Sequence, residues 1–215
     1  MPEAFIAPGI LISTIQLLLM KKLLIISSVT FLLASCGSKP TKVIVMASGK
    51  ITAEGNTVNF EPGTTHNEVT IQDPGESIVV KSEGNDKSFP VAGPGTYILN
   101  LKKDTLAGSY QQVGKDVSQE VISQEALAQK VDSLYRLMAG TNVSAAARNY
   151  NIKPGELAKI TDNGNAQVVG PFMRMPASFE GGKELEIYKF YTNKELRETA
   201  EKLTKMITPA EPVEE

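Results

Sequence analysis

Few side chains in this 215-residue chain can do nucleophilic or metal chemistry, because it contains one cysteine, Cys36, and one histidine, His66. A single cysteine excludes an internal disulfide, and a single histidine leaves the Cys/His zinc patterns without enough ligands. His66 lies in a turn-like stretch, residues 64–67, without a companion nucleophile, which favours a solvated loop residue over a general base. The sequence therefore predicts no catalytic residue, no metal site and no cofactor.

The one thiol, Cys36, ends a stretch that has the layout of a secretory signal. In chain order this stretch comprises Met20, the basic pair Lys21 and Lys22, an apolar run over residues 23–33, and the small residues Ala34 and Ser35. The apolar run has eleven residues, fewer than the ~20 that a helix needs to cross a bilayer. We therefore interpret residues 20–35 as a signal peptide and residues 1–19 as an extension upstream of the expected start at Met20.

The tetrapeptide Leu33-Ala34-Ser35-Cys36, followed by Gly37, resembles the lipobox of bacterial lipoproteins. In that family the cysteine sulfur receives a diacylglycerol, a peptidase cuts just before the cysteine, and the new amine is acylated, with chains such as palmitate. The resemblance implies cleavage between Ser35 and Cys36, lipidation of Cys36 and a tether over residues 36–42. Several acyl chains on one residue meet the two-signal requirement for stable anchoring. The alternative is a small, buried cysteine at the end of an apolar segment.

The residues after Cys36 indicate where such a lipoprotein would reside. Gly37, rather than Asp, follows the cysteine, and by the family's sorting rule in many Gram-negative bacteria this permits transfer to the outer membrane. No acidic cluster follows in the sequence, which weakens the case for display on the cell surface. We expect an outer-membrane protein that faces the periplasm, with the outer leaflet of the inner membrane and the cell surface as alternatives.

The composition is that of an ordinary globular protein, with 41% hydrophobic and 21% charged residues. Such a chain can bury one or two modest cores. The formal net charge of -2 provides no broad basic field, which argues against nucleic acid as a partner. The expected partners are the membrane, through lipid on Cys36, and an envelope protein or peptidoglycan.

Short apolar runs separated by turn signals, at a spacing of about ten residues, predict β-structure over residues 43–116. The expected strands span residues 43–47, 50–53, 57–60, 68–72, 77–81, 96–101 and 108–113. Pro-Gly pairs at residues 62–63, 74–75 and 94–95 predict type II turns. We therefore expect an N-terminal domain that is an antiparallel, β-sandwich-like module.

Helical spacing of apolar residues replaces this pattern from residue 117. The expected helices span residues 118–139, ended by Gly140, then 141–148, and 193–206, which follows a capping box formed by Thr192 and Glu195. The expected strands span residues 157–161, 166–169 and 185–191. The overall prediction is an α+β fold, with a smaller α+β domain over residues 117–207 and a flexible tail over residues 208–215.

Residues 170–179 are unusual for a loop, because two prolines accompany two methionines and two phenylalanines. This mixture of soft and aromatic side chains is typical of adaptable binding surfaces. The predicted partner-binding residues are Phe172, Met173, Met175 and Phe179. The alternative is a loop that covers a sheet edge or a helix face.

These observations favour a lipid-anchored envelope protein with a binding, scaffold or assembly role over an enzyme. The alternative is an envelope hydrolase or peptidoglycan-binding protein with an unidentified carboxylate site. Residues 150–160 are similar to the closing stretch of LysM peptidoglycan-binding modules, although a helical pattern stands where the first strand of that module belongs. The acidic residues Glu54, Glu61, Asp73 and Asp86 fall at predicted turns, where local hydrogen bonding explains them.

Overall fold

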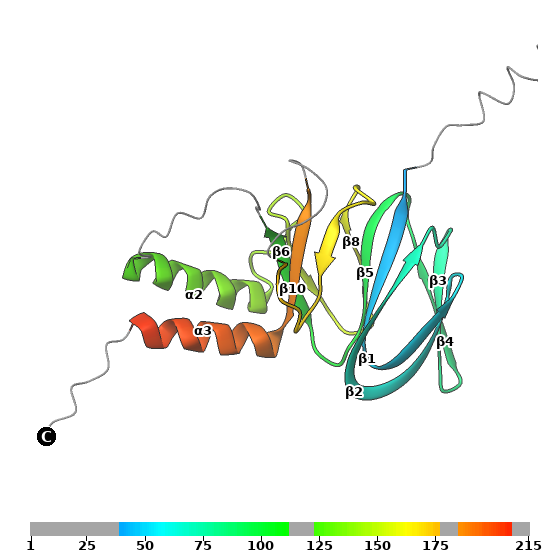
Figure 1. Ribbon diagram of the computed structural model, residues 1–215, viewed down its shortest axis with the longest axis horizontal. Helices are drawn as coiled ribbons and strands as arrows, with labels where there is room; N and C mark the ends of the chain where they lie inside the picture. The colour runs from blue at the N-terminus through cyan, green and yellow to red at the C-terminus, as the bar shows by residue number, and fades with distance from the viewer. Residues whose placement is uncertain (1–38, 112–122, 177–184, 208–215) are drawn as a thin grey trace, which may run out of the picture. The chain divides into compact units, whose positions relative to one another are not determined.

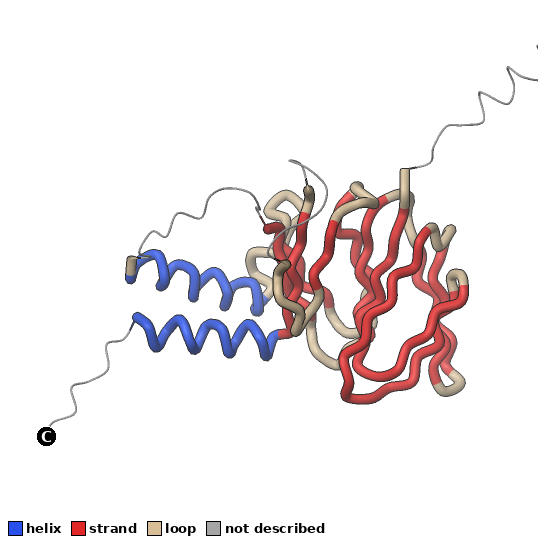
Figure 2. The backbone as a smooth tube through the Cα atoms, in the orientation of Figure 1, coloured by secondary structure: helices blue, strands red, loops and turns tan. Residues whose placement is uncertain are grey.

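Two β-sheets and two helices make up the described part of the computed structural model, which covers residues 39–111, 123–176 and 185–207 (Figures 1 and 2). The strands are β1 (Thr41–Glu54), β2 (Thr57–Gln72), β3 (Ser77–Ser82), β4 (Asn85–Pro90), β5 (Gly95–Leu101), β6 (Leu106–Gln111), β7 (Asn149–Ile152), β8 (Leu157–Thr161), β9 (Gln167–Val169) and β10 (Ile187–Thr192). The helices are α2 (Gln124–Ala139) and α3 (Asn193–Ile207). This part of the chain is mainly β with some helix, in agreement with the predicted α+β class.

The larger sheet, sheet A, has the strand order β4-β3-β2-β1-β5-β8. Strand β1 pairs antiparallel with β2 but parallel with β5, and β2 pairs parallel with β3. The sheet is therefore mixed, and the prediction of a purely antiparallel N-terminal sheet is wrong. The physical reason is that β2, β3 and β4 together form a long crossover, which brings the chain back to the free edge of β1 in the direction of β1.

Strand β1 is buried on both of its faces. Successive side chains of a strand point to opposite faces, so the Val-Ile-Val-Met run divides between two cores. Val43 and Val45 enter a core enclosed by the curl of sheet A, the inner core: Val43, Val45, Val58, Ile71, Ile78, Val80, Phe89, Val91, Tyr97 and Leu99. Ile44 and Met46 enter the inter-sheet core: Ile44, Met46, Ile98, Leu106, Tyr150, Ile152, Ile160, Ala166, Tyr188 and Phe190.

Strands β1 and β2 continue past a bulge beside Gly49, although the sequence predicted breaks at residues 48–49 and 61–67. The register shifts between Ser48, which lies opposite His66, and Gly49, which lies opposite Pro62. Gly49 has φ +134°, and a Cβ atom there would lie 2.1 Å from the carbonyl oxygen of Glu61, so only glycine fits this close approach. The predicted turn at residues 62–63 is wrong, because both residues lie within β2 at this bulge.

The smaller sheet, sheet B, has the order β7-β6-β10-β9 and lies between sheet A and the helices (Figure 1). Helices α2 and α3 lie side by side and pack on sheet B through a third cluster, the helix core, which comprises the buried Ala107, Leu137 and Leu196 with Leu134, Met138 and Tyr191 around them. This arrangement places the start of α3 directly after β10.

The predicted helix ends are confirmed where they rest on local chemistry. Thr192 donates its backbone N–H to Glu195 Oε2 at 2.8 Å, and the N–H of Glu195 donates to Thr192 Oγ1 at 3.2 Å, which is the expected capping box. Gly140 ends α2 with φ 69°. The predicted short helix over residues 141–148 is wrong, because this segment forms turns and Ser144 makes a bridge to Asn149.

Strand pairs cross the expected domain boundary between residues 116 and 117. Strand β6, from before the boundary, lies between β7 and β10, and β8, from beyond it, pairs with β5. The chain from Lys39 onward forms one compact unit. The three cores formed by the described residues lie within this unit, and they supply buried apolar groups of the kind that independent folding requires.

We predict that the unit over residues 39–215 unfolds cooperatively and that a fragment over residues 39–115 does not. The fragment retains β6 but lacks both of its neighbours in sheet B, and this leaves inter-sheet core residues such as Leu106 exposed. Circular dichroism during a denaturant titration checks this. A sharp, β-rich transition of the short fragment would show instead that residues 43–116 are an autonomous domain.

Candidate binding site

The loop after β9 displays two large apolar side chains at the surface. Phe172 is 60% exposed and Met173 is 53% exposed, whereas Met175 on the same loop is half-buried. Large apolar side chains that stay exposed beside one another mark contact surfaces more often than isolated ones do. The structure therefore brings two of the predicted partner-binding residues together at the surface.

Lys189 fixes this loop from below. The lysine lies on β10 and is only 3% exposed, and its Nζ donates to the carbonyl oxygens of Gly170, at 2.5 Å, and Met173, at 2.7 Å. A buried ammonium group is costly unless its donors are satisfied, and these carbonyl groups satisfy two of them. The burial of Lys189 and the path of the loop thus depend on each other.

Glu195 fixes the same loop from the side. Its Oε1 accepts the backbone N–H of Phe172 at 2.7 Å, while its Oε2 accepts the N–H of Thr192 in the capping box at 2.8 Å. Phe172 has φ 63°, in the left-handed region that a bulky residue rarely adopts. Such a conformation costs on the order of 1 kcal/mol and persists only where surrounding contacts hold it. The loop therefore presents Phe172 in a preset conformation.

His66 joins a polar network beneath the Phe172 ring. Lys102 Nζ lies 2.9 Å from His66 Nδ1, and Glu68 Oε1 lies 2.9 Å from His66 Nε2. When the lysine ammonium donates to Nδ1, Nε2 carries the ring proton and donates to the carboxylate. The Phe172 ring meets His66 edge-on, with the ring centroids 5.7 Å apart, and Lys102 Nζ lies 5.6 Å from the Phe172 centroid.

The prediction that His66 is a solvated loop residue is wrong. His66 belongs to β2, and its side chain is only 19% exposed. Strand β2 continues through residues 64–67 next to the bulge opposite Gly49, and the pleat of the strand places His66 on the same face as Glu68. The spacing of His66 and Glu68, two positions apart, could have indicated that their side chains lie on one face. This inference was possible only if residues 64–67 were first predicted to be a strand.

Burial dominates the electrostatics of this network. Desolvation lowers the pKa of Lys102 and the pKa of Lys189, because it disfavours the charged ammonium groups. The carboxylates of Glu68 and Glu195 act in the opposite direction on both lysines. The two carboxylates therefore offset part of the effect of burial on the pKa of each lysine.

Gly170 allows the loop to approach this network closely. A Cβ atom at Gly170 would lie 1.6 Å from Glu68 Oε1, so any larger residue would displace the Glu68 carboxylate or the loop. The carbonyl oxygen of Gly170 also accepts a hydrogen bond from Lys189 Nζ, and this bond holds the backbone of Gly170 in place next to Glu68. The absence of a side chain at Gly170 therefore leaves room for the Glu68 carboxylate.

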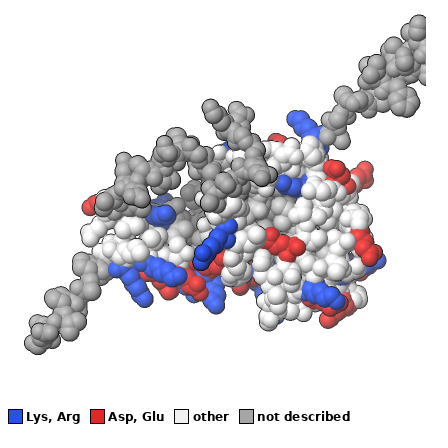
Figure 3. Space-filling view, viewed as in Figure 1, with Lys and Arg blue, Asp and Glu red and all other residues white. Residues whose placement is uncertain are grey.

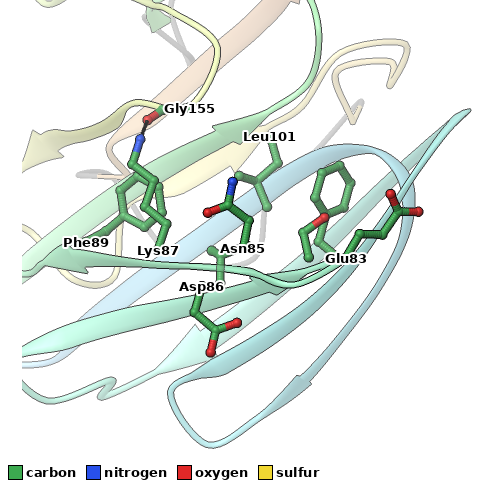
Figure 4. Close-up of a pocket in the computed structure, with 10 residues that line it drawn as sticks. Glu83, Asn85, Asp86, Lys87, Phe89, Leu101 and Gly155 are labelled. Atoms are coloured by element: carbon green, nitrogen blue, oxygen red, sulfur yellow. Dashed lines mark hydrogen bonds between the residues drawn. The ribbon is translucent and has the colours of Figure 1, made fainter.

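A separate pocket opens in sheet A near the hairpin of β3 and β4 (Figure 4). It has a volume of about 480 Å³. The lining residues are Phe60, Val80, Ser82, Glu83, Asn85, Asp86, Lys87, Phe89, Leu101 and Gly155. The sequence pattern did not predict this pocket, because β4 carries a single large apolar residue, Phe89, and Asp86 within it was expected at a turn.

Several predicted residues lie outside the described part of the chain: Ser35, Cys36 and Phe179. Among the helices that are described, none is long and apolar enough to span a membrane. Within residues 39–111, 123–176 and 185–207, no group of three or more His, Cys, Asp or Glu residues is arranged to hold a metal ion. On the face shown in Figure 3, acidic and basic side chains are interspersed, so no broad field of one sign covers that face.

The chain was compared with protein-family models, curated proteins and solved structures, and no match was found in any of the three.

We predict that Lys189→Met changes how stability depends on pH. Because the pKa of Lys189 is lowered in the folded protein, the folded state binds fewer protons than the unfolded chain as the pH approaches the ordinary lysine value of 10.5. The free energy of unfolding of the wild type, relative to the variant, should therefore rise from neutral pH toward 10.5. Denaturant titrations over this range measure the difference. The exposed Lys194→Met is the control, and equal pH profiles for both variants would contradict the account.

Proposed function

We propose that the chain is a lipid-anchored envelope protein that binds a partner protein through Phe172 and Met173. The observation that carries the proposal is the exposure of these two side chains on a loop that Lys189 and Glu195 hold in a strained conformation. A contact loop that is already ordered loses little conformational entropy on binding, so more of the contact energy appears as affinity. Exposed aromatic residues at the centre of an interface commonly dominate its binding energy.

The anchor in this proposal is Cys36. The lipobox-like sequence over residues 33–36 supports it, and strand β1 begins at Thr41, five residues beyond Cys36. Five extended residues reach at most about 18 Å. A lipid on Cys36 would therefore hold the folded unit close to the membrane, where a partner in the envelope can meet the loop. An outer-membrane location that faces the periplasm is part of this proposal, because Gly37 follows the cysteine.

We also propose that sheets A and B pack as a β-sandwich. The inter-sheet core supports this, since it draws Ile44, Met46 and Ile98 from sheet A and Tyr188 and Phe190 from sheet B. In this arrangement sheet B is the layer that links sheet A to the helices, and it places β10 beneath the Phe172 loop.

We predict that Cys36→Ala abolishes acyl labelling of the chain. Only the cysteine sulfur can accept the diacylglycerol, and the lipoprotein peptidase requires the modified cysteine at its cleavage point. Cells grown with a labelled fatty acid should give a labelled wild-type band and an unlabelled, longer precursor for the variant. Ser38→Ala, two residues further along the chain, is the matched control and should be processed normally. Equal lipid incorporation into the Cys36 variant would remove the anchor.

We predict that Met173→Asp leaves the protein folded but weakens partner binding. Met173 is exposed, and surface substitutions usually change stability by no more than about 0.5 kcal/mol. Met206, which is 68% exposed on α3, offers a matched control, because Met206→Asp makes the same chemical change away from the loop. A photo-crosslinking residue at position 173 should capture a specific envelope protein that the same residue at position 206 does not.

The competing explanation is that the loop only covers the core. In that case Met173→Asp would bury a carboxylate among apolar groups and cost several kcal/mol. Thermal melting of both aspartate variants separates the two explanations before a partner is known. A large loss of stability in the Met173 variant alone would remove the loop as a binding surface.

A further inference from the structure

The pocket in sheet A lies where the curled sheet fails to close. Lys87 on β4, at one edge of the sheet, donates from Nζ to the carbonyl oxygen of Gly155 at 3.2 Å, and Gly155 lies two residues before the start of β8 at the other edge (Figure 4). One side chain thus bridges two edges that do not pair. The opening of about 480 Å³ beside this bridge is within the range of about 300–1,000 Å³ typical of small-molecule sites.

The pleat of β4 sorts the side chains around the opening. Asn85 and Lys87 pair in register with Ser82 and Val80, which also line the pocket. Asp86 also lines the pocket, but its carboxylate points away from the side chains of Asn85 and Lys87 (Figure 4). The inward face of β4 therefore presents a cation and an amide, while its nearest carboxylate faces outward.

The floor of the pocket is apolar. It is formed by four side chains from four different strands: Phe60, Val80, Phe89 and Leu101. Phe89 and Val80 belong to the inner core, and Phe60 and Leu101 pack against it, so the floor is the open end of that core. An apolar surface of this kind favours the body of an aliphatic or aromatic ligand.

The charged group beside this floor is positioned to receive an anion. Lys87 Nζ lies 4.8 Å from the centroid of the Phe89 ring, at the border of the apolar surface. An ammonium group has three N–H donors, and the described residues provide one acceptor, the carbonyl oxygen of Gly155. Glu83 also lines the pocket but lies at the hairpin turn, at the far end of the site from Lys87 (Figure 4).

We propose that this pocket binds a small amphipathic carboxylate, with its apolar body on the Phe60, Phe89 and Leu101 surface and its carboxylate at Lys87 and Asn85. The charge-assisted hydrogen bond to Lys87 distinguishes this ligand from a neutral molecule of the same shape. The site is independent of the Phe172 loop, and its test does not depend on a partner protein.

The test uses octanoate and 1-octanol as matched probes on the compact unit over residues 39–215. Titration of each probe is followed by amide chemical shifts in nuclear magnetic resonance spectra. Octanoate should shift the amides of Phe60, Val80, Asn85, Lys87, Leu101 and Gly155, and it should bind more tightly than octanol. Shifts confined to other regions, or equal affinities for the two probes, would overturn the proposal.

Two lysine variants identify the anion contact. Lys87→Met should weaken octanoate binding about three- to tenfold, as loss of one partly exposed charged hydrogen bond implies, and leave octanol binding unchanged. Lys81→Met is the matched control, because Lys81 pairs in register with Asp86, on the outer face of the same hairpin. Both lysines are exposed, so both variants should keep the wild-type spectrum elsewhere. Equal effects of the two variants on octanoate binding would exclude a carboxylate contact at Lys87.

Discussion

The burial of β1 on both faces is the constraint on which the other layers depend. Val43 and Val45 hold the inner core, while Ile44 and Met46 hold the inter-sheet core, and all four are at most 7% exposed. Burial of each such side chain contributes roughly 1.5–3 kcal/mol. Because β5 and β2 pair with opposite edges of the same strand, a shift of β1 by one residue would exchange the side chains of both cores. The position of sheet B, and of the helices beyond it, is set by this register.

Among the residues that the structure describes, the buried charged side chains are Lys102 and Lys189. Lys189 rises from β10 toward the loop after β9, and Lys102 follows the end of β5 toward His66. Lys102 donates to the carbonyl oxygen of Ala47 and to Nδ1 of His66, and Lys189 donates to the carbonyl oxygens of Gly170 and Met173. Replacing such a group with an apolar one can be neutral for stability, so their presence points to the geometry of the loop that they hold.

The sequence was most informative where a local rule acted alone. The capping box at Thr192, the glycine end of α2 and the strand over residues 157–161 follow from nearest neighbours, and the structure agrees with each.

Strand β4 was missed because it is an edge strand whose single large apolar side chain, Phe89, leaves no alternation to detect. His66 and Lys102 were missed as a pair because their contact spans 36 positions and depends on a bulge that only the paired partner strand reveals. Lys189 does interrupt an apolar run, Ile187 to Phe190, and that interruption was the one visible sign of a buried charge.

The side chain of Glu195 contacts both the first turn of α3, where the residue lies, and the Phe172 loop. One carboxylate oxygen closes the helix cap and the other holds the backbone of Phe172, so the two segments share a single side chain. Order in one segment therefore favours order in the other, and by thermodynamic linkage the coupling is the same in both directions. A molecule that bound to the loop would slow hydrogen exchange of the backbone amides at the start of α3, even if it did not contact the helix. Fraying of that first turn would in turn lower the affinity of the loop for such a molecule.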